Sequence, residues 1–179
     1  MQIVQGVCGS IAAYKGADLC SKLVQAGHDV TVVMTDAATK LVGPLTFQAL
    51  TGRSVITDPF SHHAGDYVEH IGLADRAELL LVAPATANFL AKAAHGIADD
   101  VLLSTLLAVT CPVLIAPAMN VRMWEHKATQ RNLAICRDQL GYEIVEPGEG
   151  FLACRDVGRG RMAEPTDIAA RVAALRPGG

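Results

Sequence analysis

The chain has few of the features that mark membrane, secreted or nucleic-acid-binding proteins. No run of roughly eighteen apolar residues occurs, so the sequence predicts no membrane span. The first residues, MQIVQGVCGSIAAYK, lack the basic start and long apolar stretch of a signal peptide. The formal net charge is −3, whereas nucleic-acid-binding surfaces are basic. These absences predict a cytoplasmic protein with a small-molecule partner, no nucleic acid and no membrane.

The cysteines offer neither a disulfide scaffold nor a zinc site. They are scattered, odd in number (5) and form no C-x-x-C pair. We therefore interpret most of them as buried small apolar residues. His62 and His63 are adjacent, but they have no third ligand at a suitable spacing, so we expect loop residues there and no metal site.

Apolar segments of strand length alternate with segments of helical period, which is typical of an α/β fold with a parallel sheet. The length of 179 residues fits one domain. We expect strands at residues 2–7, 29–35, 77–84 and 111–119, with a weaker fifth at 141–147. Helical segments are expected at 10–26, 86–109 and 121–140, and a final helix from Pro165. Residues 43–68 and 148–164 do not fit this alternation and are expected to be long loops, which are often functional.

Ligands of doubly wound sheets bind at the carboxyl ends of the strands, and this selects the candidate segments GVCGSIAA, MTDAA, APATAN and APAMN. In the first, backbone N–H groups and the Ser10 hydroxyl could receive a phosphate at the start of a helix. The segment matches neither G-x-G-x-x-G nor the P-loop pattern. A second interpretation is that Gly6 and Gly9 only permit a tight turn.

Small residues follow Ala-Pro at two strand ends and leave flat space for a planar ring. Asn88 and Asn120 in these segments are alternatively helix N-caps, which is the commonest role of asparagine at such positions. His70, next to Glu69, is a candidate proton-transfer group, although a lone histidine is more often structural.

Five segments in order, GSIAAYK, HIGLADRAELLLVAPATAN, GIADDVLLST, PAMNVRMW and LACRDVGRGRMAEP, carry a resemblance. Together they resemble the flavin-dependent cysteine decarboxylases, most closely the phosphopantothenoylcysteine decarboxylases of coenzyme A biosynthesis. The resemblance implies a Rossmann-like, flavodoxin-like three-layer fold with a central parallel sheet. It also implies a single FMN-binding domain over residues 1–179, with a substrate flap at about 148–164. Related bifunctional proteins carry a synthetase domain after this region, so we expect the stand-alone carboxy-lyase.

The resemblance also implies roles for individual residues. His70 matches the catalytic base, Cys154 the flap cysteine that acts as proton donor, and Asn120 the ligand of the substrate carboxylate, with Met123 and Ala153 also at the substrate. The positions that match the FMN contacts are Gly9, Ser10, Ile11, Thr35, Thr86, Ala87, Asn88, Phe89 and Ala118. The family assembles as a homotrimer or a dodecamer of trimers, with each active site between subunits.

The implied reaction is FMN-dependent decarboxylation of 4'-phosphopantothenoylcysteine to 4'-phosphopantetheine. A flap cysteine favours the saturated thiol as product, because a thiol of pKa about 8.5 is mostly protonated at neutral pH. Arg155 departs from the family, which usually has glycine after the flap cysteine; it either reaches a substrate phosphate or faces solvent. The alternatives are an enethiol-forming decarboxylase of C-terminal peptidyl cysteine, a non-catalytic flavin-binding regulatory subunit, and a flavin prenyltransferase.

Overall fold

A five-stranded parallel sheet lies at the centre of the computed structural model, which describes residues 1–58, 69–151 and 157–175. The strand order is β2-β1-β3-β4-β5, with all neighbouring strands parallel. The strands are β1 (Gln2–Val7), β2 (Asp29–Met34), β3 (Leu79–Ala85), β4 (Val113–Pro117) and β5 (Glu143–Ile144). The expected α/β fold is therefore confirmed, and each of the five predicted strands is present, although the last has only two residues.

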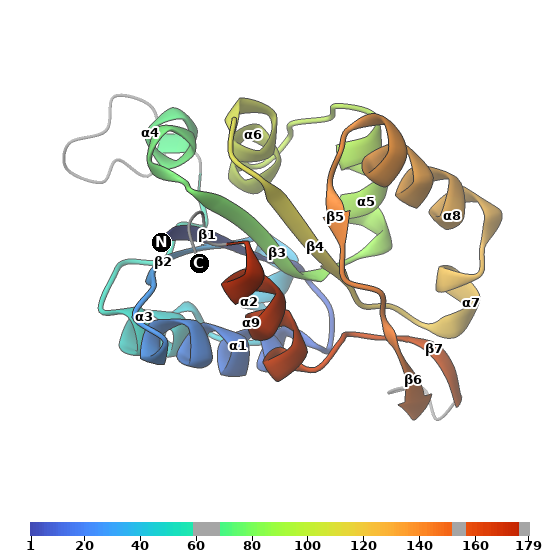
Figure 1. Ribbon diagram of the computed structural model, residues 1–179, viewed down its shortest axis with the longest axis horizontal. Helices are drawn as coiled ribbons and strands as arrows, with labels where there is room; N and C mark the ends of the chain where they lie inside the picture. The colour runs from blue at the N-terminus through green and yellow to red at the C-terminus, as the bar shows by residue number, and fades with distance from the viewer. Residues whose placement is uncertain (59–68, 152–156, 176–179) are drawn as a thin grey trace.

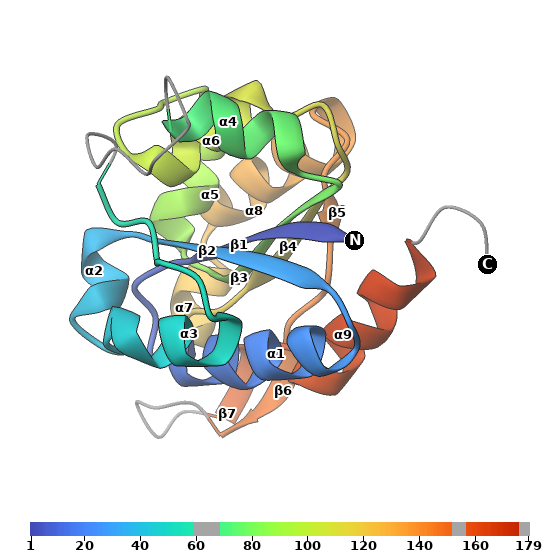
Figure 2. The same ribbon diagram turned by 90° about the vertical axis from the view of Figure 1, so that its left-hand side faces the viewer.

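Helices cover both faces of the sheet and give three layers, as Figure 1 and Figure 2 show. One face carries α1 (Ala13–Gln25), α3 (Pro44–Thr51) and α9 (Pro165–Ala174). The other carries α4 (Glu69–Arg76), α5 (Ala87–Ala94), α6 (Val101–Ala108) and α8 (Lys127–Ala134). A short helix, α2 (Asp36–Thr39), follows β2. This arrangement is the three-layer, Rossmann-like fold that the sequence predicts.

Successive strand residues enter opposite layers of the core. Leu79 and Leu81 pack with the α1 side, whereas Leu80 and Val82 pack with the α6 side. All seven residues of β3 are buried. Strands covered on both faces need continuous apolar sequence rather than alternation, which explains why ELLLVAP was recognisable as a strand.

Two predicted helical segments are broken in the structure. Residues 86–109 form α5 and α6 rather than one helix, because Gly96 adopts a positive φ of 66° and Asp100 caps the second helix through Leu103 N–H. Residues 121–140 form α7 (Val121–Trp124), α8 and the π-helical turn η1 (Ile135–Gln139). His126 separates the first two by capping α8 through Ala128 N–H. The apolar residues keep a helical period across both breaks, so the sequence pattern did not indicate where the helices end.

The two segments expected to be loops contain regular structure. Residues 44–51 form α3, with proline at its start and Gly52 at its end in the left-handed conformation. Within 148–164, β6 (Gly148–Phe151) and β7 (Val157–Arg161) form a separate antiparallel pair. The expectation of a loop was therefore wrong for these residues. The positions between β6 and β7 lie outside the described residues.

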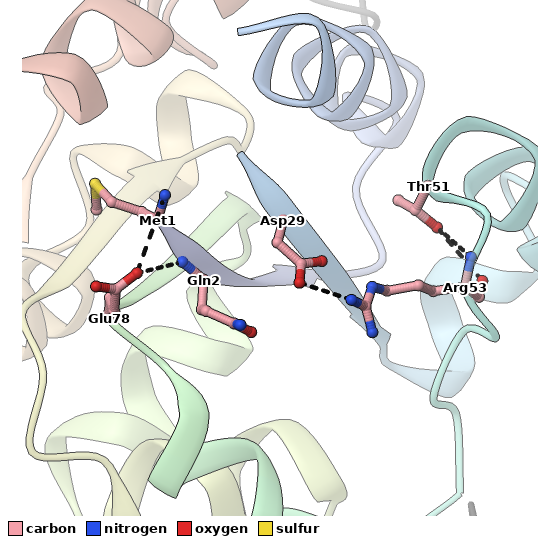
Figure 3. A network of polar contacts seen from close by, with 6 residues as sticks. All are labelled: Met1, Gln2, Asp29, Thr51, Arg53 and Glu78. Carbon is pink, nitrogen blue, oxygen red and sulfur yellow. Dashed lines mark hydrogen bonds and ion pairs between the residues drawn. The ribbon is translucent and has the colours of Figure 1, made fainter. Parts of the chain in front are cut away.

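Polar contacts tie together the amino-terminal edge of the sheet (Figure 3). The Glu78 carboxylate accepts a hydrogen bond from the Gln2 N–H at 2.6 Å and lies 4.0 Å from the amino group of Met1. Arg53 pairs with Asp29 at 2.6 Å. These pairs are partly exposed, so each contributes little stability. Polar groups at this edge are thus paired with one another, and the cavity described below lies at the opposite edge.

Among the described helices, none combines the length and the apolar character that crossing a lipid bilayer requires.

Candidate functional site

A cavity of about 600 Å³ lies at the carboxyl-terminal edge of the sheet. β1 and β3 are neighbours there, but the chain leaving β1 returns on the far side as β2, so the turns after β1 and β3 diverge. Such a switch point is where doubly wound sheets bind ligands. The cavity is lined by Gly9, Ser10, Ile11, Ala12, Tyr14, Lys15, Thr86, Ala87, Ala118, Met119, Asn120, Met123, Gly160, Arg161 and Met162.

Backbone hydrogen bonds hold the turns around the cavity in register. The Cys8 N–H donates to the Pro84 carbonyl at 3.1 Å, which joins the turn after β1 to β3. The Ala118 N–H donates to the Ala85 carbonyl at 2.9 Å, which joins β3 to the turn after β4. Burial raises the pKa of the Cys8 thiol to about 12, so this cysteine is an apolar packing group rather than a nucleophile.

The start of α1 suits an anion. Its N-cap residue, Ala12, has no side-chain oxygen to bond the first-turn N–H groups, and no acidic residue occurs in that turn. The positive end of a 13-residue helix therefore faces the cavity, and the first turn contains no acidic residue of its own. The Ser10 hydroxyl accepts the Ala12 N–H at 3.3 Å and so shapes the turn.

The two asparagines differ. Asn120 is the N-cap of α7, and its side-chain oxygen accepts the Arg122 N–H at 2.8 Å. Asn88 is not a cap, since Thr86 caps α5 through Phe89 N–H. Asn120 nevertheless lines the cavity. The capping bond fixes its oxygen toward the helix, so the amide nitrogen is the group suited to donate to a ligand.

Most of the residues expected to contact cofactor or substrate come together here. Thr35, Asn88 and Phe89 are exceptions among the described residues: they do not line the cavity. Thr35 caps α2, and Phe89 is buried in the core beneath α5. The expected residues that line it are Gly9, Ser10, Ile11, Thr86, Ala87, Ala118, Asn120 and Met123.

His70 does not line the cavity of its own chain. It lies in the first turn of α4, half-buried, beside the buried Glu69. α4 packs beside α6 on the sheet face opposite α1, as Figure 2 shows. Ala153, Cys154 and Arg155 lie outside the described residues.

Strand β7 forms a wall of the cavity. It lies within the segment expected to be a substrate flap, but the sequence predicted neither a strand there nor that Gly160 lines the cavity. The Met119 N–H donates to the Gly160 carbonyl at 2.9 Å, and a side chain at Gly160 would lie 2.4 Å from the Met119 carbonyl oxygen. A side chain at Gly158 would lie 2.8 Å from a methyl carbon of Val121. The two glycines let the strand approach the segment that carries Asn120. The glycines of GRGRM are a sequence signal for a close backbone approach, but the sequence does not show that Met119 is the residue approached.

Comparison with known proteins identifies the family. The model of the flavoprotein family matches residues 1–176. The chain belongs to the flavoprotein family.

Several relatives in this flavoprotein family are named enzymes. The chain is 42% identical to a probable phosphopantothenoylcysteine decarboxylase of Streptococcus mutans, over 96% of both chains. It is 54% identical to the coenzyme A biosynthesis bifunctional protein CoaBC of Bacillus subtilis over 90% of its own length. It spans only 40% of that bifunctional protein.

Two solved structures resemble this flavoprotein closely. A PPC decarboxylase variant complexed with pantothenoylaminoethenethiol is 31% identical, with a TM-score of 0.87 and 97% coverage of both chains. The FMN-dependent cysteine decarboxylase SpaF is 41% identical, with a TM-score of 0.82 and 98% coverage of both chains.

The close contact between β7 and the Asn120 segment predicts that adding a methyl group at Gly160 destabilises the protein. Gly160→Ala would place a Cβ against a backbone oxygen, in a residue with a φ of 145°, and we expect a loss of about 1–3 kcal/mol in the free energy of unfolding. Urea unfolding measures it. Gly148→Ala on the paired strand is the control, because nothing lies within 4 Å of its Cβ position. Equal stability of the two variants would contradict the assigned contact.

Proposed function

We propose that this flavoprotein catalyses FMN-dependent decarboxylation of 4'-phosphopantothenoylcysteine to 4'-phosphopantetheine, a carboxy-lyase reaction of coenzyme A biosynthesis. The observation that carries the proposal is the end-to-end likeness to the named decarboxylase of Streptococcus mutans, at 42% identity over 96% of both chains. The cavity supports it, because the matching positions Asn120 and Met123 lie in its wall.

The cavity has the properties that FMN requires. Its volume of about 600 Å³ is within the usual range for cofactor sites. Small residues of the turns, Gly9, Ala87 and Ala118, leave room for a planar ring, and the start of α1 suits the phosphate. When bound, FMN supplies a two-electron acceptor, which an N-acylated cysteine needs because its amide nitrogen cannot form a Schiff base.

Three side chains would act on the substrate. Asn120, with its oxygen held by the cap, donates from its amide nitrogen to the substrate carboxylate and holds it in place. His70 assists removal of a proton from the substrate. Cys154 would donate a proton to the enethiol, and the saturated thiol would form when the bound flavin also returns the two electrons that it had accepted.

His70 can act only if a second copy of the chain brings it to the cavity, because the cavity of its own chain is not lined by it. We therefore propose a homo-oligomer with shared active sites, a trimer or a dodecamer of trimers. Exposed apolar side chains at the cavity support this: Ile11 is 63% exposed, Tyr14 61% and Met123 49%. Apolar groups gathered at a cavity mouth favour a partner that covers them.

A second candidate is an enethiol-forming decarboxylase of peptidyl cysteine. The observation that favours it is the likeness to two FMN-dependent cysteine decarboxylases that are not named PPC decarboxylases: SpaF at 41% identity and TvaF from thioviridamide biosynthesis at 32%. The two functions differ in substrate size and in the fate of the enethiol.

Product masses separate the two candidates. Protein loaded with FMN is incubated with 4'-phosphopantothenoylcysteine and, separately, with a peptide ending in cysteine. We expect turnover of the first to the saturated thiol. Cys154→Ser should release the enethiol, two hydrogens lighter, and His70→Asn should make neither product. Release of only the lighter product by the unaltered protein would contradict the proposal.

Shared active sites predict complementation between two inactive variants. His70→Asn and Asn120→Ala damage different chains of one site, so oligomers that contain both keep some intact sites. Co-expressed with two affinity tags and purified through both, they should regain activity that neither variant has alone. Mixed oligomers without activity would show that both residues act within one chain.

A further inference from the structure

A carboxylate and two cations meet at the cavity wall where β7 approaches α1. Lys15 Nζ lies 2.9 Å from Glu164 Oε1, and Arg161 Nη2 lies 3.1 Å from the same oxygen. Lys15 Nζ also lies 3.5 Å from the Met162 carbonyl oxygen. Lys15 and Arg161 both line the cavity. One oxygen therefore connects the first turn of α1, the end of β7 and the residue that precedes α9.

Burial makes Lys15 depend on this carboxylate. Its side chain is only 7% exposed, whereas those of Glu164 and Arg161 are 50% and 42% exposed. An ammonium group removed from water needs a partner, and the partner is destabilising to remove. The Lys15 hydrogen bond in turn lowers the pKa of the Glu164 carboxyl, so the carboxylate is ionised at neutral pH.

The local sequence does not favour a lysine at this position. Lys15 is in the first turn of α1, where the helix dipole disfavours a positive charge. Its partner is 149 residues away along the chain. The compensation is therefore tertiary, and it occurs at the place where the β6–β7 pair meets the turn that follows β1.

We propose that Glu164 is a positioning residue, which fastens β7 to the first turn of α1 and thereby keeps the Gly160–Met119 contact and Asn120 aligned over the cavity. Glu164 does not line the cavity and so acts through Lys15 and Arg161. Only the kinetic test of this inference rests on the proposed function. The structural role of Glu164 does not depend on it.

A second ion pair on the same strand serves as a matched control. Arg159 Nη2 lies 3.3 Å from Glu146, with side chains 49% and 45% exposed. Neither residue lines the cavity. Glu146→Gln therefore removes a carboxylate that is paired with an arginine of the same strand, β7, without touching the connection to α1.

Hydrogen exchange of the FMN-loaded protein tests the fastening directly. The Met119 amide bonds to Gly160, so its exchange reports whether β7 stays in place. Glu164→Gln should raise the exchange rate of the Met119 amide about tenfold or more. Glu164→Asp should raise it less, and Glu146→Gln should leave it unchanged. An unchanged rate in Glu164→Gln would overturn the proposal.

Kinetics of the same variants test the positioning role. Glu164→Gln should lower kcat/KM about tenfold and raise the released fraction of enethiol, while the FMN dissociation constant changes less than about threefold. A loss of kcat/KM explained entirely by lost FMN would overturn the positioning role. If the unaltered protein does not decarboxylate the substrate, the proposed function fails. The exchange data would still test whether Glu164 holds β7 against α1.

Lys15→Met/Glu164→Gln distinguishes positioning from mere charge compensation. Removing both charges should restore the melting temperature that Glu164→Gln lowers, because no unpaired ammonium remains buried. The Met119 amide should still exchange fast, since the connection is absent. Restoration of slow exchange together with stability would show that Glu164 only neutralises Lys15.

Discussion

The divergence of the chain at the carboxyl ends of β1 and β3 is the constraint on which the rest of the structure depends. Because β2 pairs with the outer side of β1, the turns after β1 and β3 lead in opposite directions and leave a crevice. The crevice persists because the turns after β1, β3 and β4 place small residues such as Gly9, Ala87 and Ala118 in its wall, and because turns on neighbouring strands are bonded backbone to backbone. A ligand site at this edge follows from topology before any side chain is considered.

The hairpin β6–β7 completes this crevice with a wall from the other end of the chain. Its glycines permit close contact with the Asn120 segment, and Glu164 connects it to α1.

The helices that begin at the cavity differ in how their first N–H groups are bonded. The starts of α5 and α7 are capped by Thr86 and Asn120, while the N-cap of α1 offers no side-chain oxygen. The first-turn N–H groups of α5 and α7 are therefore bonded by side-chain caps. Those of α1 have no such cap, and this helix start is the one that suits a phosphate.

Strong apolar strands and the ordered motifs made most of the architecture predictable from the sequence. Four segments at strand ends were predicted to bind a ligand because parallel strands end at one edge. Those after β1, β3 and β4 line the cavity, whereas the segment after β2, with Thr35, does not. The breaks near Gly96 and at His126 were not predicted, because helical period alone does not show where a cap interrupts a helix. Lys15 and Glu164 were not connected, because nothing local signals a contact across 149 residues. His70 was expected at the site by resemblance, yet the cavity of its own chain is lined by other residues.

Binding of FMN tests most directly that the switch-point cavity is the cofactor site. The titration compares the unaltered protein with Ala87→Leu, which fills the cavity from the first turn of α5, and with Ala98→Leu on the exposed turn before α6. We predict that Ala87→Leu raises the FMN dissociation constant about tenfold or more, with Ala98→Leu unchanged. Equal affinity of all three proteins, each folded, would contradict the assignment of the cavity to FMN.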